Sequence, residues 1–179
     1  MGQYYKAVLL ADDTDEISTY LESWDYDSGT KLMEHSWIGN AFVEAVEKLL
    51  STQTRVVWAG DYADAEPDNI SPTNLYSRTR AAVKASPLPA CAVGRYVINH
   101  DKHLYVDKAT VLANRHGYRI HPLPILTVEG NGRGGGDLHA HRTSGEFSVV
   151  GTWARDRITI SDTAPDSYEQ LPFDLIEHW

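Results

Sequence analysis

The feature that most constrains how this chain can fold is its glycine-rich segment, residues 130–136, in which five of seven residues are glycine. Glycine lacks a Cβ atom, so such a run gains little from a helix or a strand and favours a loop with unusual backbone angles. An apolar stretch containing two prolines, residues 120–128, leads into this loop, and the pattern Asp137-x-His139-x-His141 follows it. We therefore expect a loop here that is flanked by ionisable side chains.

Hydrophobic periodicity predicts an α+β fold that is rich in strands. Apolar residues recur at helical spacing over residues 38–51, which predicts a helix with Glu44, Glu47 and Lys48 facing outward. A second helix is expected over 72–85. Apolar and β-branched runs predict strands at 4–10, 17–24, 31–35, 55–59, 95–98, 104–106, 147–153 and 157–161, and the prolines favour an extended chain over 118–128. The expected architecture is a mostly antiparallel, twisted sheet with these two main helices packed on it.

A short phrase, Trp-Ala-x-Asp, occurs twice, at residues 58–61 and 153–156. Each copy follows a run with β-branched residues, and each half of the chain opens on a tyrosine-bearing hairpin pattern. This suggests a single domain built from two similar halves, 1–86 and 93–161, with a tail at 162–179; chance similarity between short phrases is the alternative. A true duplication would bring the two phrases together at a cleft.

The charge balance argues against a polyanionic partner. With 16 Lys and Arg against 25 Asp and Glu, the formal net charge is −9 at pH 7, so neither a nucleic-acid polymer nor an anionic membrane is expected as the main partner. Cys91 is the single cysteine, which excludes an internal disulfide and fits a cytoplasmic setting. No apolar run reaches the roughly 18 residues of a membrane span, and residues 1–6 lack a signal-peptide pattern.

The glycine-rich segment favours the binding of a small anion. Successive backbone N–H groups in such a loop can surround a phosphate or carboxylate, and an arginine within it can add a bidentate clamp. The predicted ligand-binding residues are Gly130, Asn131, Gly132, Arg133, Gly134, Gly135 and Gly136, with Trp58 or Trp153 as an apolar wall and Asp61 and Asp156 as acceptors for ligand hydroxyls. The expected function is recognition of a small phosphorylated or otherwise anionic, nucleotide-like ligand in a cleft between this loop and the two Trp-Ala-x-Asp strand ends. In the alternative interpretation, the glycine-rich loop is solvated at the surface, the tryptophans belong to the core and the aspartates cap turns.

The histidines near the loop support an alternative, catalytic interpretation. Asp137, His139 and His141 alternate, so an extended chain would direct all three to one face as a ligand set for a divalent metal. With His121 as an acid or base and Asp156 as a further carboxylate, they would suit a hydrolase or transferase acting on the same ligand. No cofactor other than such a metal is expected, and exposed histidines in a strand are the simpler explanation.

The acidic surplus supports a third hypothesis, a protein-interaction module of the inhibitor or immunity type that meets a basic partner. Several carboxylates lie in the turn expected between the first two strands, namely Asp12, Asp13, Asp15 and Glu16. Reversing their charges would then abolish function, whereas Arg133→Ala would leave it intact. On either side of Asp156, Arg155 and Arg157 are expected either to be solvated or to pair with this acidic surplus.

Overall fold

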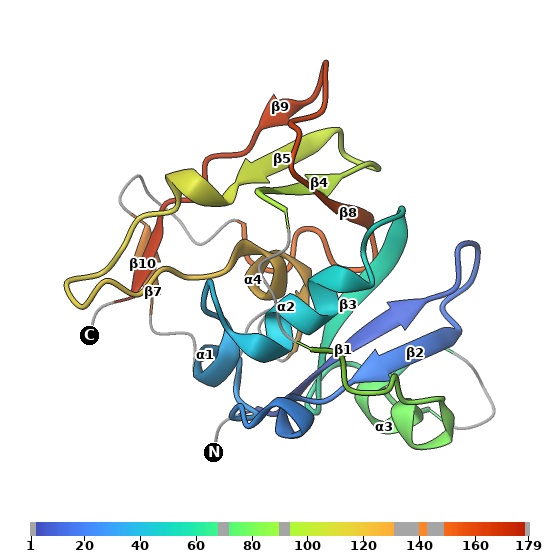
Figure 1. Cartoon of the computed structure of the whole chain (residues 1–179). Helices are drawn as coiled ribbons and strands as arrows, with labels where there is room; N and C mark the ends of the chain where they lie inside the picture. Colours follow the sequence, from blue (N-terminus) through green and yellow to red (C-terminus); the bar gives the residue numbers. More distant parts are fainter. Residues whose placement is uncertain (1–2, 68–71, 90–93, 131–139, 143–148, 178–179) are drawn as a thin grey trace.

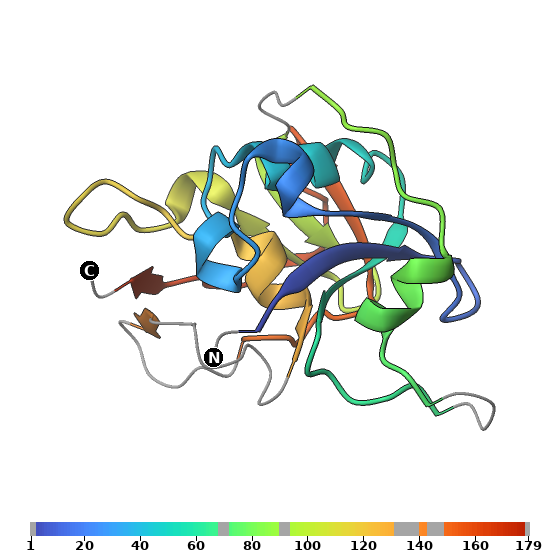
Figure 2. The same ribbon diagram turned by 90° about the horizontal axis from the view of Figure 1, so that it is seen from below.

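The computed structural model of the chain describes residues 3–67, 72–89, 94–130, 140–142 and 149–177, with the backbone alone for 140–142 and 177. Figures 1 and 2 show a twisted sheet whose strands come from both halves of the chain, with short helices packed against it. The predicted α+β fold class is confirmed at this level.

The main sheet has eight strands within the described residues. They are β1 (Tyr5–Leu10), β2 (Ile17–Leu21), β3 (Thr54–Gly60), β4 (Tyr96–Asn99), β5 (Leu104–Asp107), β6 (Val128–Glu129), β8 (Arg157–Ser161) and β9 (Glu169–Gln170). The order is β2–β1–β3–β8–β4–β5–β9, and β6 pairs with the C-terminal end of β3. Neighbours are antiparallel except β3–β6 and β5–β9. The sheet is therefore mostly antiparallel, as predicted.

One pair of strands joins the two halves of the sheet. β3 and β8 pair antiparallel through Thr54 with Ile158 and Arg55 with Arg157. On one side of this seam lie β1 and β2, and on the other lie β4 and β5. The shared origin of the two halves stays a prediction.

The described residues contain four α-helices, α1 (Leu32–His35), α2 (Ala41–Lys48), α3 (Leu75–Arg78) and α4 (Pro122–Thr127). Side chains of β1 alternate between two cores, because successive residues of a strand point to opposite faces. Ala7 and Leu9 enter the larger core together with residues of α1, α2 and α4. Val8 and Leu10 enter a smaller core with Leu75 of α3. Burial on both faces explains why β1 has a continuous apolar run.

The first predicted helix is present but shorter, and one of its faces was misassigned. Asn40 caps α2, because its side-chain oxygen accepts hydrogen bonds from the backbone N–H groups of Phe42 and Val43, at 3.0 and 3.2 Å. Glu47 was expected to face solvent, but it is 1% exposed. It forms an ion pair with Lys108 and accepts a hydrogen bond from His121, and both residues belong to the second half of the chain.

Two other predicted elements differ from the structure. Residues 32–35 form the one-turn helix α1 in place of the strand predicted over 31–35, because the Glu34 carboxylate accepts the N–H of the N-cap residue Lys31 at 3.0 Å and closes the turn. The helix expected over 72–85 is reduced to α3 and the 3-10 turn η2 (Thr79–Ala81). The chain after η2 is extended, because residues 83–85 form hydrogen bonds with the outer edge of β2. The Ala85 N–H, for example, donates to the Tyr20 carbonyl at 2.9 Å. This contact covers an otherwise open sheet edge.

Helix α4 lies where the prolines had predicted an extended chain. Pro122 and Pro124 both fall in its first turn, where backbone N–H groups have no partner within the helix, so proline costs nothing there. His121 caps the helix: its Nδ1 accepts the Leu123 N–H at 3.1 Å. All six residues of α4 are buried. The apolar stretch before the glycines is therefore a core helix.

The remaining elements are short. They are the 3-10 turns η1 (Ser23–Tyr26) and η3 (Lys108–Thr110), and the paired strands β7 (Ala140–Arg142) and β10 (Leu175–Glu177). The strand predicted over 147–153 is wrong for its described part, because residues 149–154 form turns. In the tail, Phe173 and Leu175 are buried in the larger core. Within the described residues, no helix has both the length and the apolarity needed to span a membrane.

Candidate functional site

Most of the predicted anion loop and metal site lies outside the described residues. This applies to Asn131, Gly132, Arg133, Gly134, Gly135, Gly136, Asp137 and His139, and the side chain of His141 is likewise not described. The anion-binding loop and the metal site therefore stay predictions. Among the described residues, no group of three or more His, Cys, Asp or Glu side chains could hold a metal ion.

Gly130 permits close packing at the start of this loop. A Cβ atom built on it would lie 2.4 Å from Gln3 Oε1 and 2.9 Å from Tyr5 Oη, and both of these residues are buried. Gly60, at the end of β3, is similarly crowded: its Cβ would lie 2.9 Å from the Glu129 carbonyl oxygen and 2.9 Å from Tyr5 Cε1. These two glycines allow β1, β3 and β6 to pack closely where the glycine-rich segment begins.

Gly60→Ala is expected to lower the free energy of unfolding by about 1–3 kcal/mol, because the added methyl group collides with backbone as well as with a buried ring. Urea denaturation followed by circular dichroism measures this change. An unaltered unfolding midpoint would show that β6 can move away without cost.

The two tryptophans belong to the core and not to a cleft wall. Trp58 is 0% and Trp153 is 1% exposed. The indole N–H of Trp58 donates to Nε2 of the buried His35 at 2.9 Å. Neither ring face is open to a ligand in this structure.

The two aspartates lie near opposite ends of β3. Asp61 follows the C-terminal end of the strand, and its Oδ1 accepts the Tyr4 N–H at 3.0 Å. The Asp156 carbonyl accepts the Val56 N–H near the N-terminal end at 3.3 Å. The Asp156 carboxylate accepts a hydrogen bond from Asn99 at 2.7 Å and pairs with Lys102. The expected meeting of the two carboxylates is therefore absent.

His121, predicted as an acid or base, is also enclosed. It is 1% exposed, its Nδ1 caps α4, and its Nε2 contacts Glu47 Oε1 at 3.1 Å. Burial lowers the pKa of the imidazole, so it is neutral near pH 7 and carries the proton that it donates to Glu47 on Nε2. These contacts explain His121 as a structural residue of the core.

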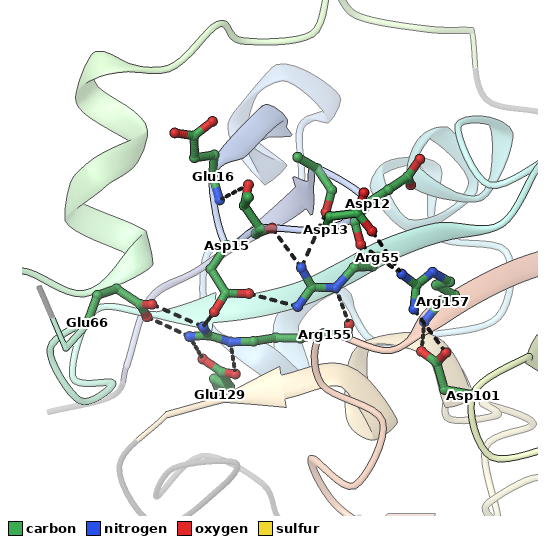
Figure 3. A network of polar contacts seen from close by, with 12 residues as sticks. Asp12, Asp13, Asp15, Glu16, Arg55, Glu66, Asp101, Glu129, Arg155 and Arg157 are labelled. Atoms are coloured by element: carbon green, nitrogen blue, oxygen red, sulfur yellow. Dashed lines mark hydrogen bonds and ion pairs between the residues drawn. The ribbon is translucent and has the colours of Figure 1, made fainter.

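A different residue of the second Trp-Ala-x-Asp phrase organises the surface: Arg155 (Figure 3). Its Nε donates to Glu129 at 2.6 Å, and its Nη2 donates to Glu66 at 2.5 Å and to Glu129 at 2.8 Å. Its Nη1 donates to Glu66 and to Asp15, both at 3.0 Å. A guanidinium group has five N–H donors, so all five are directed to three carboxylates.

The backbone at Arg155 is held as firmly as its side chain. Its φ is +69°, a left-handed conformation that non-glycine residues seldom adopt and that persists only where surrounding contacts enforce it. Its N–H donates to the Val56 carbonyl at 2.9 Å. Burial alone would lower the pKa of the guanidinium, but its hydrogen bonds to Glu129 and Glu66 outweigh burial and raise that pKa above its ordinary value.

Two further arginines extend this network along the sheet. Arg55 donates to Asp15 at 2.7 Å and to the Thr14 carbonyl at 2.6 Å. Arg157 donates to the Asp101 carboxylate at 3.1 Å and to the Asp12 carbonyl at 2.8 Å. Arg155 and Arg157 therefore pair with acidic residues, which is one of the two alternatives that the sequence left open.

Asp15 and Asp101 of this network are ionised at neutral pH. Burial would raise the pKa of Asp15, but hydrogen bonds and charge from Arg55 and Arg155 outweigh it and leave the pKa below its ordinary value. Burial would likewise raise the pKa of Asp101, but hydrogen bonds from the backbone N–H and the guanidinium of Arg157 outweigh it and lower that pKa overall. Proton transfer near pH 7 is therefore not a property of these two groups.

Three adjoining hollows are lined by Arg155 or by its carboxylate partners. Their volumes are about 770, 490 and 510 Å³. The first two share Glu66, and the first and third share Asp15. Among the described residues that line them are nine carboxylates and five guanidinium groups, a formal net charge of −4. We call this continuous region the Arg155 surface; its carboxylates are Asp12, Asp13, Asp15, Glu16, Asp64, Glu66, Asp101, Glu129 and Asp156, and its guanidinium groups are those of Arg55, Arg78, Arg80, Arg155 and Arg157.

Part of the predicted cleft does converge on this surface. The second hollow brings Gly130, at the start of the glycine-rich segment, together with residues 63–67 and with Ala154 and Arg155. Residues 63–67 follow the Trp-Ala-x-Asp phrase at 58–61, and Ala154 and Arg155 lie within the phrase at 153–156. Segments at or next to both phrases therefore line this surface, but Trp58, Asp61 and Trp153 are not among the residues that line this hollow.

The chain matches no family model, no curated protein and no solved structure. A function for this chain is therefore inferred from the geometry of the Arg155 surface.

Proposed function

We propose that the chain is a binding protein whose Arg155 surface docks on a basic surface of a partner protein. The observation that carries this proposal is the saturation of Arg155 by Asp15, Glu66 and Glu129. With its donors used, the guanidinium has none to offer an anion. The carboxylates around it outnumber the cations, so the surface attracts positive charge.

The three carboxylates that hold Arg155 retain unused acceptor capacity. Each carboxylate can accept about four hydrogen bonds, and each of these three accepts two in the network. Lysine and arginine side chains of a partner could use the remaining lone pairs without breaking the existing contacts. A ligand phosphate would instead meet uncompensated negative charge.

The acidic hairpin between β1 and β2 is presented in a fixed conformation. Arg55 and Arg157 hold its backbone through the carbonyls of Thr14 and Asp12 (Figure 3). Asp13 and Glu16 remain exposed at its tip, and Asp13 is 94% exposed at its side chain. A loop that is already ordered loses little conformational entropy on binding. This arrangement supports the interaction-module hypothesis of the inhibitor or immunity type.

Charge reversal at this tip tests the proposal. Asp13→Lys with Glu16→Lys is expected to weaken binding of an N-acetylated, C-amidated hexa-arginine peptide roughly tenfold at low ionic strength, because long-range attraction is lost. NMR titration of the labelled protein measures the affinity and locates the peptide. The matched control reverses Asp162 and Asp166, which are exposed on the tail.

If the control pair weakens peptide binding equally, the affinity depends only on the net charge of the protein, and the proposal would fail. It would also fail if the peptide perturbed signals away from the Arg155 surface. The anionic-ligand hypothesis is tested separately: it requires inorganic phosphate or a nucleotide to bind and Arg133→Ala to abolish that binding. The docking proposal requires Arg133→Ala to leave peptide binding unchanged.

A further inference from the structure

The largest hollow of the Arg155 surface is lined by side chains of both charges. Its carboxylates are Asp15 and Glu16 of the hairpin and Glu66. Its guanidinium groups, those of Arg78 and Arg80, come from the α3–η2 segment. The lining also includes apolar side chains, namely Ile17, Pro67, Ala81 and Ala82. Its volume of about 770 Å³ lies within the range of small-molecule sites, roughly 300–1,000 Å³.

Two of these charges are unpaired within the described part of the chain. Arg80 and Glu16 are exposed, and neither takes part in an ion pair among the described residues. This distinguishes them from Arg155, whose donors are all used. An incoming group can therefore bind Arg80 or Glu16 without displacing a partner.

We infer that this hollow binds a basic amino-acid unit, that is, a carboxylate and a side-chain cation joined by an aliphatic chain. The carboxylate would bind Arg80, and the cation would bind Glu16 and Asp15. The methylene groups between them would lie on the apolar lining, as long basic side chains do on protein surfaces. Three carboxylates and two guanidinium groups give the hollow a charge of −1, which complements the +1 charge of lysine or arginine.

Such a unit has two sources, a free amino acid and the C-terminal residue of a polypeptide. The inference does not rest on docking of a basic protein surface, because it requires a carboxylate that the capped hexa-arginine peptide lacks. The two proposals can therefore fail separately.

Isothermal titration with L-arginine and agmatine tests the inference, because agmatine is arginine without its carboxylate. L-arginine is expected to bind roughly three- to tenfold more tightly than agmatine, the range of one exposed charge-assisted contact. Arg80→Ala is expected to remove this preference, and Glu16→Gln is expected to weaken both ligands. Arg115→Ala serves as the control, because Arg115 is exposed and lies outside the hollow.

Two peptide arms identify the source. The first probe is a tripeptide that ends in arginine with a free carboxylate, and the second is its C-terminal amide. If the free acid binds as tightly as L-arginine and more tightly than the amide, the site is assigned to a chain terminus. Binding of the free amino acid alone would assign it to a metabolite. Equal affinity for L-arginine and agmatine, or a preference that survives Arg80→Ala, would overturn the inference, and so would the absence of binding by all four probes.

Discussion

Glu47→Ala is expected to lower the free energy of unfolding by roughly 3–5 kcal/mol, the range found when one member of a buried ion pair is removed. Glu47 lies on α2 and is 1% exposed, and its Oε1 is 2.6 Å from Lys108 Nζ and 3.1 Å from His121 Nε2. Alanine would remove the carboxylate that pairs with the Lys108 ammonium. It would also leave a cavity beneath α4.

The protonation states of this cluster follow from its geometry. Burial acts to raise the pKa of Glu47, but the contacts with His121 and Lys108 outweigh it and lower the pKa. Burial lowers the pKa of His121. The cluster therefore holds one carboxylate, one ammonium group and one neutral imidazole. Since it contains a full ion pair, removing both charges is expected to cost less than removing one.

Three variants distinguish charge from packing in this cluster. Urea denaturation is expected to rank Glu47→Ala as less stable than Glu47→Gln, because glutamine keeps the volume and an acceptor. The double variant Glu47→Leu with Lys108→Met is expected to be more stable than Glu47→Ala, since no buried charge is left without a partner. A double variant that is no more stable than Glu47→Ala would show that packing, and not the loss of the Glu47–Lys108 ion pair, dominates the change in stability.

Elements with a strong local signal were predictable from the sequence. The β1–β2 hairpin, β3, the β4–β5 hairpin and β8 lie where apolar runs and turn residues predicted them. Helix α2 follows from its apolar stripe. The orientation of Glu47 was not predictable, because its partners His121 and Lys108 are 74 and 61 residues away. A glutamate on a helix is assigned to solvent unless such partners are known.

Helix α4 shows a second limit of sequence interpretation. Two prolines in an apolar run favour an extended chain by local preference alone. Proline is compatible with a helix when it lies in the first turn. The first turn of α4 begins at His121, however, and histidine is an uncommon N-cap, so the sequence does not mark where the helix starts. The helix is stabilised by complete burial, which is a tertiary effect.

The Arg155 surface was only partly predictable. The repeated phrase indicated residues 153–156, and Arg155 was expected to pair with acidic residues if it was not solvated. Its partners Glu129, Glu66 and Asp15 lie 26, 89 and 140 residues away. None of them has a local pattern that identifies the others. Contact between distant segments, and not the phrase itself, creates the site.

Acid is expected to destabilise the fold through His35, which is buried in the core. Its Nδ1 lies 2.9 Å from the Gly29 carbonyl and its Nε2 accepts the Trp58 indole N–H at 2.9 Å. The first contact requires a proton on Nδ1 and the second requires a lone pair on Nε2. A second proton would therefore break the bond to Trp58 and place a charge in the core. Burial lowers the pKa of His35 to about 4.

The direction of the effect follows from linkage. The folded-state pKa of His35 is depressed from 6.5 to about 4, so the unfolded chain binds the proton first. Stability is then fully present above pH 6.5 and is lost as pH falls towards 4. For one such group, the loss between pH 7.5 and 5 is about 2 kcal/mol. His121 acts in the same direction, because its pKa is also lowered by burial.

His35→Gln isolates this contribution. Glutamine can still accept the Trp58 N–H but does not titrate, so the variant is expected to be less stable than the wild type at pH 7.5 and to lose about 2 kcal/mol less than the wild type between pH 7.5 and 5. Urea denaturation at a series of pH values measures both quantities. His116→Gln is the matched control, because His116 is exposed and its removal should leave the pH dependence intact. Parallel pH profiles for His35→Gln and the wild type would exclude His35 as the origin of acid sensitivity and direct attention to the His121–Glu47 pair.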